Sequence, residues 1–297
     1  NFPTHRAEYH AYGKKVWQRM FQDAGYTIVN YRKGPAFSGY GFGCVRTRRL
    51  LERFGFSSEH IFVLQSMSVF EQRARTFTYS VLPRASYYEQ EKFIRDWMNK
   101  EKSAHSFLND FMHAVGNPYE KKVLDVGFGN GIILSAFRES GADAYGLEID
   151  EKLFAIGQQT MKEKNITLNL SLYDGTHFPY EDSFFDYVYS TSVFEHMSRP
   201  DLVLKEIART LKTGGKFYLS FPNKYAFKES HTGLWGISML PRPLTQWILR
   251  RYHSSPLEDW NLHFLSYFDI KRMARRAGLR ISITTDARTP LKKVIKK

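Results

Sequence analysis

Three glycines and one acid at the end of an apolar strand are the residues best placed to do chemistry in this chain. Residues 123–126 read Val-Leu-Asp-Val, so Asp125 lies near the carboxyl end of a predicted buried strand. The glycines follow at alternate positions: Gly127, Gly129 and Gly131. Glycine lets the backbone pass close to a ligand, and a strand, glycine turn and helix in this order form a nucleotide-sized pocket. The Asp125 carboxylate could face a cation or accept hydrogen bonds, so the stretch predicts a cofactor-using enzyme.

Two further acids follow the next predicted strands. Glu148 comes one helix and one strand after the glycine turn, where a carboxylate can hold both hydroxyls of a ribose. Alternatively, Glu148 is only a solvated charge at the end of the strand. Asp150 could bind the ribose in its place, or could be the N-cap of the next helix. Asp174 follows a predicted strand at 166–172, and with Gly175 it either contacts a ligand or merely starts a turn. The glycine spacing differs from the dinucleotide pattern G-x-G-x-x-G, which disfavours a dehydrogenase.

A third block contains the most specific pattern. A predicted strand from Asp186 is followed by Ser192 and then by His196. Apolar residues at helical spacing predict a helix at 201–211, and Gly214-Gly215 end it before a strand at 216–221. We expect Asp186 to be structural. His196 is a candidate base, although a histidine just after a strand is more often structural.

These motifs, in this order, resemble the class I S-adenosylmethionine-dependent methyltransferases. The resemblance covers about residues 119–223, extends more weakly to about 285, and is greatest to the quinone-biosynthesis, small-molecule and glycan methyltransferases. It implies an α/β fold: a Rossmann-like, doubly wound, mostly parallel seven-stranded sheet with helices on both faces. It also implies S-adenosyl-L-methionine as the cofactor.

The resemblance assigns roles residue by residue. It implies that the cofactor is bound by Asp125, Gly127, Phe128, Gly129, Gly131, Glu148, Asp174, Gly175 and Ser192. Asp125 and the glycines match the cradle of the methionine end, Glu148 matches the acid on the ribose, and Asp174 matches the residue beside the adenine amino group. Phe128 departs from the family, which usually has a small residue there. Its ring either packs under the sheet or crowds the cofactor.

The mechanism implied by this cofactor needs little from the protein besides positioning. The sulfonium methyl group is already electrophilic, so holding the acceptor in line supplies much of the rate. A hydroxyl acceptor also needs a base within hydrogen-bond reach, and the candidates are His196 and His231. The single cysteine, Cys44, excludes an intrachain disulfide and a cysteine-based zinc cluster, and we expect no metal site.

The length and charge distribution predict two parts. The 297 residues carry a net charge of +13, concentrated in the first 85 residues and in the lysines at the end of the chain. We expect a basic, aromatic α+β extension at 1–85 and a methyltransferase domain at 86–297, with a lid insertion at about 223–263. Within the insertion, the apolar, arginine-containing segment 235–252 is a substrate lid, a membrane-surface contact or a unit packed on its own core.

The acceptor is left open among several classes. The expected partner is a small molecule, a glycan or a lipid precursor, methylated on O or N. An RNA-directed methyltransferase or RNA-binding protein is the alternative, since arginines are interspersed with aromatic residues around Arg46–Arg53. A second alternative is a non-catalytic methyltransferase-like module, because the Phe128 ring could crowd the cofactor.

No apolar run is near the ~18 residues that span a bilayer, and no signal peptide is visible. These observations predict a cytoplasmic protein, with peripheral membrane contact as an alternative.

The two ends of the chain share a pattern. Residues 19–28 read R-M-x-x-x-A-G-x-x-I, and the same letters recur at 272–281. Both predict a helix, a closing glycine and a strand. No obvious last strand follows residues 281–283, so we expect residues 1–66 to resemble the tail of a methyltransferase domain. They derive from an upstream copy, or else residues 61–64 complete this domain's own sheet.

Overall fold

The computed structural model describes residues 14–33, 60–83, 87–229, 231–252, 261–286 and 289–296. The basic segment Arg46–Arg53, Cys44 and the hypothesis of an RNA-binding surface lie outside these residues. The chain forms two compact units that divide between Arg73 and Ala74.

In its described residues, the first unit contains one helix, a two-stranded antiparallel sheet and the start of a further helix. Its elements are α2 (Lys14–Asp23), β1 (Tyr26–Lys33) and β2 (His60–Ser66). Gly25 ends α2 with a positive φ of 84°, and its carbonyl accepts a hydrogen bond of 2.8 Å from the Met67 amide. The prediction that residues 61–64 complete the methyltransferase sheet is therefore wrong, because they pair with β1.

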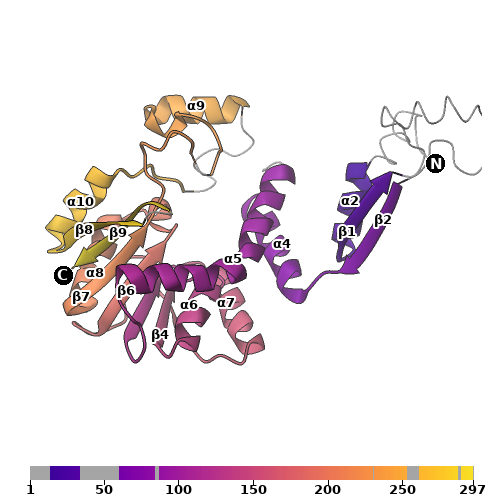
Figure 1. Cartoon of the computed structure of the whole chain (residues 1–297). Helices are drawn as coiled ribbons and strands as arrows, with labels where there is room; N and C mark the ends of the chain where they lie inside the picture. Colours follow the sequence, from indigo (N-terminus) through magenta and orange to yellow (C-terminus); the bar gives the residue numbers. More distant parts are fainter. Residues whose placement is uncertain are drawn as a thin grey trace, which may run out of the picture. The chain divides into compact units, whose positions relative to one another are not determined.

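The second unit is built on a seven-stranded sheet with the order β5-β4-β3-β6-β7-β9-β8 (Figure 1). The parallel strands are β3 (Lys122–Val126), β4 (Asp143–Glu148), β5 (Asn169–Leu172), β6 (Phe185–Thr191) and β7 (Leu211–Ser220). β9 (Thr289–Lys296) lies between β7 and β8 (Arg280–Asp286) and is antiparallel to both. The sheet confirms the predicted doubly wound, mostly parallel architecture.

The expectation that the chain lacks a last strand after residues 281–283 is wrong, since β9 is that strand. Its sequence, Thr-Pro-Leu-Lys-Lys-Val-Ile-Lys, has no apolar run. Backbone pairing on both sides satisfies its amide and carbonyl groups whatever its side chains are. The shared pattern at the two ends extends to the structure, because Gly278 follows α10 (Tyr267–Arg276) with a φ of 81°, and two antiparallel strands complete each copy. Descent of the first unit from an upstream domain stays a prediction.

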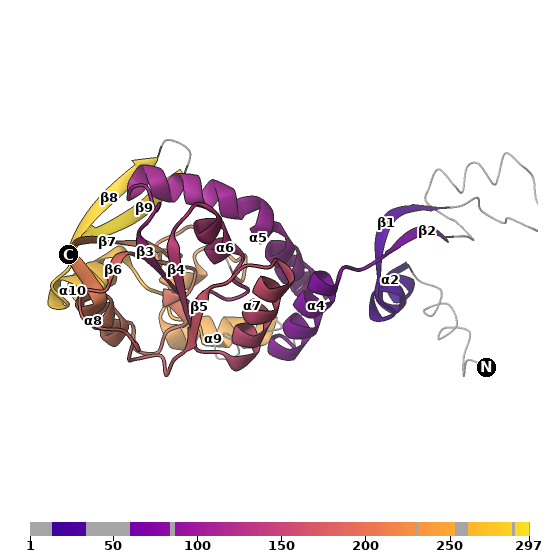
Figure 2. The same ribbon diagram turned by 90° about the horizontal axis from the view of Figure 1, so that it is seen from below.

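Helices cover both faces of this sheet (Figure 2). One face carries α5 (Tyr87–Ala114), α6 (Ile132–Glu139) and α7 (Glu151–Glu163), and the other carries α8 (Pro200–Thr210) and α10. On the first face, the rings of Phe111 and Phe137 pack edge to face at 4.9 Å, and Phe137 stacks on Tyr189 at 4.6 Å. On the second face, the core contains Leu204 and Ile207 of α8.

α4 (Val69–Val81) is the reason that the second unit begins before residue 85. Arg75 donates a hydrogen bond of 2.5 Å to Glu91 of α5, and the Phe77 ring packs edge to face on Trp97 at 5.0 Å. The pairing keeps a buried guanidinium satisfied. Most of α4 therefore belongs to the same unit as α5.

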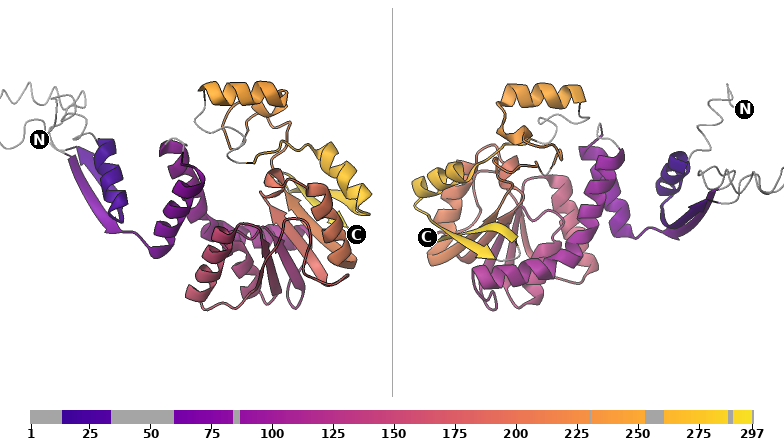
Figure 3. Two further views of the ribbon diagram at one scale, coloured as in Figure 1. Left: turned by 180° about the vertical axis from the view of Figure 1, so that it is seen from behind. Right: turned by 45° about the horizontal axis from the view of Figure 1, so that its top comes forward.

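In the segment after β7, helix α9 (Arg242–Tyr252) stands apart from the sheet (Figure 3). The segment also contains the short helix η2 (Ile237–Met239). Ile237, Leu249 and Leu262 form a small core of its own. None of the described helices is long and apolar enough to cross a membrane.

Candidate active site

The glycine turn between β3 and α6 adopts a backbone that other residues avoid. Positive φ angles of 86°, 58° and 76° occur at Gly127, Gly129 and Gly131. A Cβ on Gly127 would lie 2.6 Å from Cγ2 of Val193, just after β6. The turn after β3 and the segment after β6 therefore approach each other as closely as a glycine allows.

Glu148 fixes this turn from the end of β4. Its carboxylate accepts hydrogen bonds from the amides of Gly129 (2.9 Å), Ile149 (2.8 Å) and Asp150 (3.2 Å). Burial raises the pKa of Glu148, and the three amides oppose the shift. Asp150 is the N-cap of α7 and accepts a hydrogen bond of 2.9 Å from the Leu153 amide. The two neighbouring acids thus have separate structural tasks.

Asp125 lies buried at the carboxyl end of β3. Burial raises its pKa to about 7, while the Tyr189 hydroxyl and the Lys100 ammonium lower it. The Lys100 side chain reaches from α5 toward the turn, and its Nζ lies 3.9 Å from where a Cβ on Gly129 would stand. The Lys100 residue is exposed overall, but burial of its ammonium lowers the Lys100 pKa. The nearby carboxylates of Asp125 and Glu148 act in the opposite direction and raise it. The positive charge of Lys100 therefore partly neutralises the negative charges of Asp125 and Glu148, which a ligand at the turn would also contact.

Asp174 is exposed after β5, and its own loop uses its carboxylate. The Oδ1 atom accepts hydrogen bonds from the amides of Thr176 and His177, each at 2.7 Å, which lower the Asp174 pKa. Gly175 has a φ of 85°, and a Cβ there would lie 2.7 Å from Cδ1 of Ile149. Ile149, directly after β4, is 57% exposed, so an apolar side chain lies beside Gly175 at this loop.

The Phe128 side chain packs inside the domain and is only 4% exposed. Two glycines make room for its ring. A Cβ on Gly146 of β4 would lie 2.7 Å from Cδ1 of Phe128, and a Cβ on Gly157 of α7 would come even closer to the ring. The Phe154 ring lies 6.0 Å away, centroid to centroid. A ring buried in this way does not crowd the surface of the turn, which removes the reason for the hypothesis of a non-catalytic module.

Replacing Phe128 by alanine should therefore destabilise the domain by about 3–5 kcal/mol, the range for buried phenylalanines. Chemical denaturation of the full chain measures the loss. Phe268→Ala is the matched control, because this ring is 67% exposed, and its expected effect is within about 0.5 kcal/mol. Equal losses in the two variants would contradict the packing of Phe128.

Beyond the glycine turn lies a cavity of about 300 Å³. Ser192 lines it with a positive φ of 55°, and its amide donates a hydrogen bond of 2.9 Å to the Ser220 carbonyl. Glu195 and Glu229 also line it, as do Asn223 and His263. Glu195 belongs to the short helix η1 (Phe194–His196) after β6, whereas the other three follow β7. The cavity is therefore shared between the sheet and the inserted segment.

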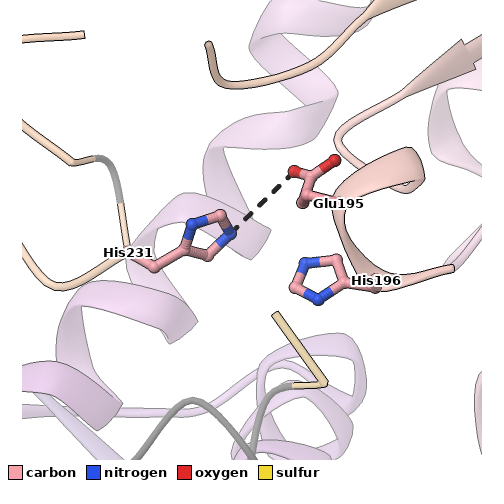
Figure 4. Close-up of side chains that lie close together, drawn as sticks. All are labelled: Glu195, His196 and His231. Atoms are coloured by element: carbon pink, nitrogen blue, oxygen red, sulfur yellow. Dashed lines mark ion pairs between the residues drawn. The ribbon is translucent and has the colours of Figure 1, made fainter. Parts of the chain in front are cut away.

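His196 and His231 lie together beside Glu195, one of the residues that line the cavity, although they are far apart in the sequence. Their ring centroids are 5.3 Å apart and the rings meet edge to face (Figure 4). Glu229 accepts a hydrogen bond of 2.6 Å from the Thr232 amide, and its Oε1 lies 2.8 Å from Nδ1 of His231. Burial raises the Glu229 pKa, but these partners outweigh it and hold the pKa at about 2.

The sequence prediction missed three residues of this site: Lys100, Glu195 and Glu229. Glu195 directly precedes His196, and Glu229 stands two positions before His231, so both lie next to candidates that were identified. An acid close to a candidate histidine was therefore the sequence signal that could have identified Glu195 and Glu229. Lys100 has no such signal, because a lysine on an amphipathic helix is normally a solvated charge.

Comparison with known proteins agrees with this geometry. A family described as "Methyltransferase domain" matches residues 124–219. A ubiquinone/menaquinone biosynthesis C-methyltransferase of Cupriavidus pinatubonensis is 27% identical over 124 residues, which are 40% of this chain and 51% of the relative. A ubiquinone biosynthesis O-methyltransferase of Coxiella burnetii is 27% identical over 142 residues, 43% and 61% of the two chains. The alignments thus cover only about half to three-fifths of these relatives.

Among solved structures, the PH0226 protein of Pyrococcus horikoshii has the same fold. The TM-score is 0.50 at 17% identity, and the match covers 73% of this chain and 97% of that one.

The fold and the matched segment define a nucleotide-cofactor α/β domain with its site at the carboxyl ends of the strands. The chain carries a class I S-adenosylmethionine-dependent methyltransferase domain, distantly related to the ubiquinone-biosynthesis methyltransferases. S-adenosylmethionine is the methyl donor of that family.

Proposed function

We propose that this protein transfers a methyl group from S-adenosylmethionine to a hydroxyl oxygen of a small molecule, glycan or lipid precursor. One observation carries the proposal. A cavity lined by Glu195, whose carboxylate is buried, also includes Ser192, which lies next to the glycine turn. An acceptor in the cavity would meet a methyl donor at the turn on one side and a proton acceptor on the other.

The residues of the turn fit the cofactor. Asp125 would accept hydrogen bonds from the amino group of its methionine end, and Lys100 would pair with its carboxylate. Glu148 has three amide partners, which fix its orientation while its four lone-pair sites leave room for a ribose hydroxyl. Ile149 offers an apolar wall to the base. When bound, S-adenosylmethionine supplies an electrophilic methyl group on a positively charged sulfur.

Glu195 has the proton affinity that a base for a hydroxyl needs at neutral pH. Burial raises its pKa to about 7, and the nearby His231 lowers it. A general base is most effective when its pKa lies near the working pH. Of the earlier base candidates, His231 is held by Glu229 and faces Glu195, so it is suited to orient the carboxylate and pass the proton onward.

The lining of the cavity favours a polar acceptor with an apolar neighbour. Asn223 and His263 offer hydrogen bonds, while Phe221 and Phe264 offer ring faces. We propose that the segment 223–263 is the lid of this cavity. The lid exposes Phe227 and Trp235 at 78% and 75%, and an acceptor with a lipid portion would cover such rings.

Methyl transfer from labelled cofactor to fractions of a cell extract tests the proposal. We expect a labelled methyl ether as the product, and we expect Glu195→Gln to lower the rate at least a hundredfold, the scale of a lost general base. Glu181→Gln, at an exposed position, should leave the rate unchanged. A labelled N-methyl or C-methyl product, or a Glu195→Gln variant as fast as the parent, would refute the assignment to oxygen.

A further inference from the structure

Three side chains, of which Glu195 lines the cavity, have the composition of a metal site. Figure 4 shows Glu195 and His196, adjacent on η1, opposite His231 of the inserted segment. One ligand atom from each, a carboxylate oxygen and two imidazole nitrogens, lie within 4.8 Å of one another. The sequence alone gave no metal-ligand spacing, because the third residue comes from a distant segment.

The Glu195 carboxylate is the independent sign of a missing ligand. The residue is 1% exposed, and within the part of the chain that the structure describes neither carboxylate oxygen has a hydrogen-bond partner. Nε2 of His231 lies 3.9 Å from Oε1, which is too far for a hydrogen bond. A buried carboxylate without partners costs several kcal/mol, so such a group calls for an ion or water that satisfies it.

Glu229 holds His231 as metal-binding histidines are held. Its Oε1 lies 2.8 Å from Nδ1, which turns the opposite ring nitrogen, Nε2, toward Glu195. Histidines that bind metals commonly donate their second ring N–H to a carboxylate, which fixes the tautomer and strengthens the ligand. Glu229 is itself fixed by the amides of His231 and Thr232.

We propose that Glu195, His196 and His231 bind one divalent transition-metal ion of the zinc class. Two imidazole nitrogens and one carboxylate oxygen suit zinc, cobalt, manganese and iron, and three protein ligands leave a coordination position open to the cavity. With bonds of about 2.0–2.2 Å, neighbouring ligands of a tetrahedral ion lie about 3.4 Å apart. The observed 3.9 Å between Glu195 and His231 is longer than that value, and the three ligand atoms lie within 4.8 Å of one another, so a bound ion would draw them closer.

The charge of the cluster agrees with a dication. Glu195 and Glu229 bring two carboxylates, and Glu195 is buried away from water. If the proposed function holds, on which this step rests, an ion there would polarise the acceptor oxygen and ease loss of its proton. In the ion-free protein Glu195 remains the base of the proposed function; with the ion bound it would be a ligand, and the proton would pass to His263, which lines the same cavity.

Metal titration of the full chain tests the site. After treatment with a chelator, the chain is titrated with Co²⁺, whose visible absorption bands report tetrahedral nitrogen and oxygen ligands. Competition with Zn²⁺ then gives the Zn²⁺ affinity. We expect one saturable ion per chain. Glu195→Gln and His231→Ala should each weaken Zn²⁺ binding at least a hundredfold, and Glu229→Gln about 10–100-fold, as for other outer partners of metal ligands.

His263→Ala, in the same cavity, and His177→Ala, on an exposed loop, are the matched controls and should bind as the parent does. If Glu195→Gln unfolds, His196→Ala replaces it. No saturable ion, or an ion retained in all ligand variants, would overturn the proposal. The two proposals fail separately. Absence of a saturable ion overturns the metal site, whereas a labelled N-methyl or C-methyl product, or absence of S-adenosylmethionine binding in calorimetry with chelator present, overturns the proposed function.

Discussion

Replacing Asp125 by asparagine should make the protein more stable above neutral pH while it loses affinity for the cofactor. The Asp125 pKa is raised by burial from 3.8 to about 7. Between these two values the folded chain binds a proton that the unfolded chain has lost, so stability falls as pH rises through this window. Asparagine removes the buried charge, and the expected gain at pH 8 is on the order of 2–4 kcal/mol.

Denaturation at pH 4 and pH 8 measures this effect, and calorimetry measures the affinity, which should fall at least tenfold. Asp174→Asn is the matched control with the opposite sign. The amides of Thr176 and His177 lower the Asp174 pKa, so that carboxylate contributes stability above its ordinary pKa, and the contribution is lost as pH falls. A parental pH dependence in Asp125→Asn would contradict the assignment.

Replacing Gly127 by alanine should disrupt the cofactor site more than any other single methyl group in the turn. The new Cβ would adopt a φ of 86° and lie 2.6 Å from Val193. The left-handed backbone costs about 1–2 kcal/mol for a non-glycine residue, and overpacking adds about 1–3 kcal/mol. We expect a loss of about 2–5 kcal/mol and no measurable cofactor binding.

Two variants separate the causes. Gly214→Ala has a similar φ of 79° but no atom within 4 Å of the new methyl group, so only the backbone cost of about 1–2 kcal/mol should remain. In Gly127→Ala, the additional change Val193→Ala should recover part of the stability. Equal losses at Gly127 and Gly214 would show that the β3 and β6 ends do not meet as described.

The strand ends of this domain could be predicted because they follow local rules. An apolar run, an acid and a glycine turn succeed one another at β3, and the acids after β4 and β5 come at regular intervals. β9 escaped prediction because its pairing, and not its composition, makes it a strand. The accommodation of Phe128 also needed the structure, since Gly146 and Gly157 lie on different elements.

The acceptor side of the site was less predictable for a physical reason. His196 and His231 were identifiable singly as titratable residues, the first just after a strand and the second in the insertion. Their meeting depends on how the segment after β7 returns over the sheet, and no periodicity encodes that path. Glu195 became a candidate only when its burial and its lack of hydrogen-bond partners among the described residues were visible.

Calorimetric titration of the full chain with S-adenosylmethionine tests the central claim most directly. We expect one cofactor per chain. Glu148→Gln should weaken binding at least tenfold, because an amide replaces the carboxylate that holds the Gly129 amide and would receive the ribose. Glu181→Gln should bind as the parent does. Absence of binding by the parent, or equal affinity in Glu148→Gln, would contradict a cofactor site at the ends of β3 and β4.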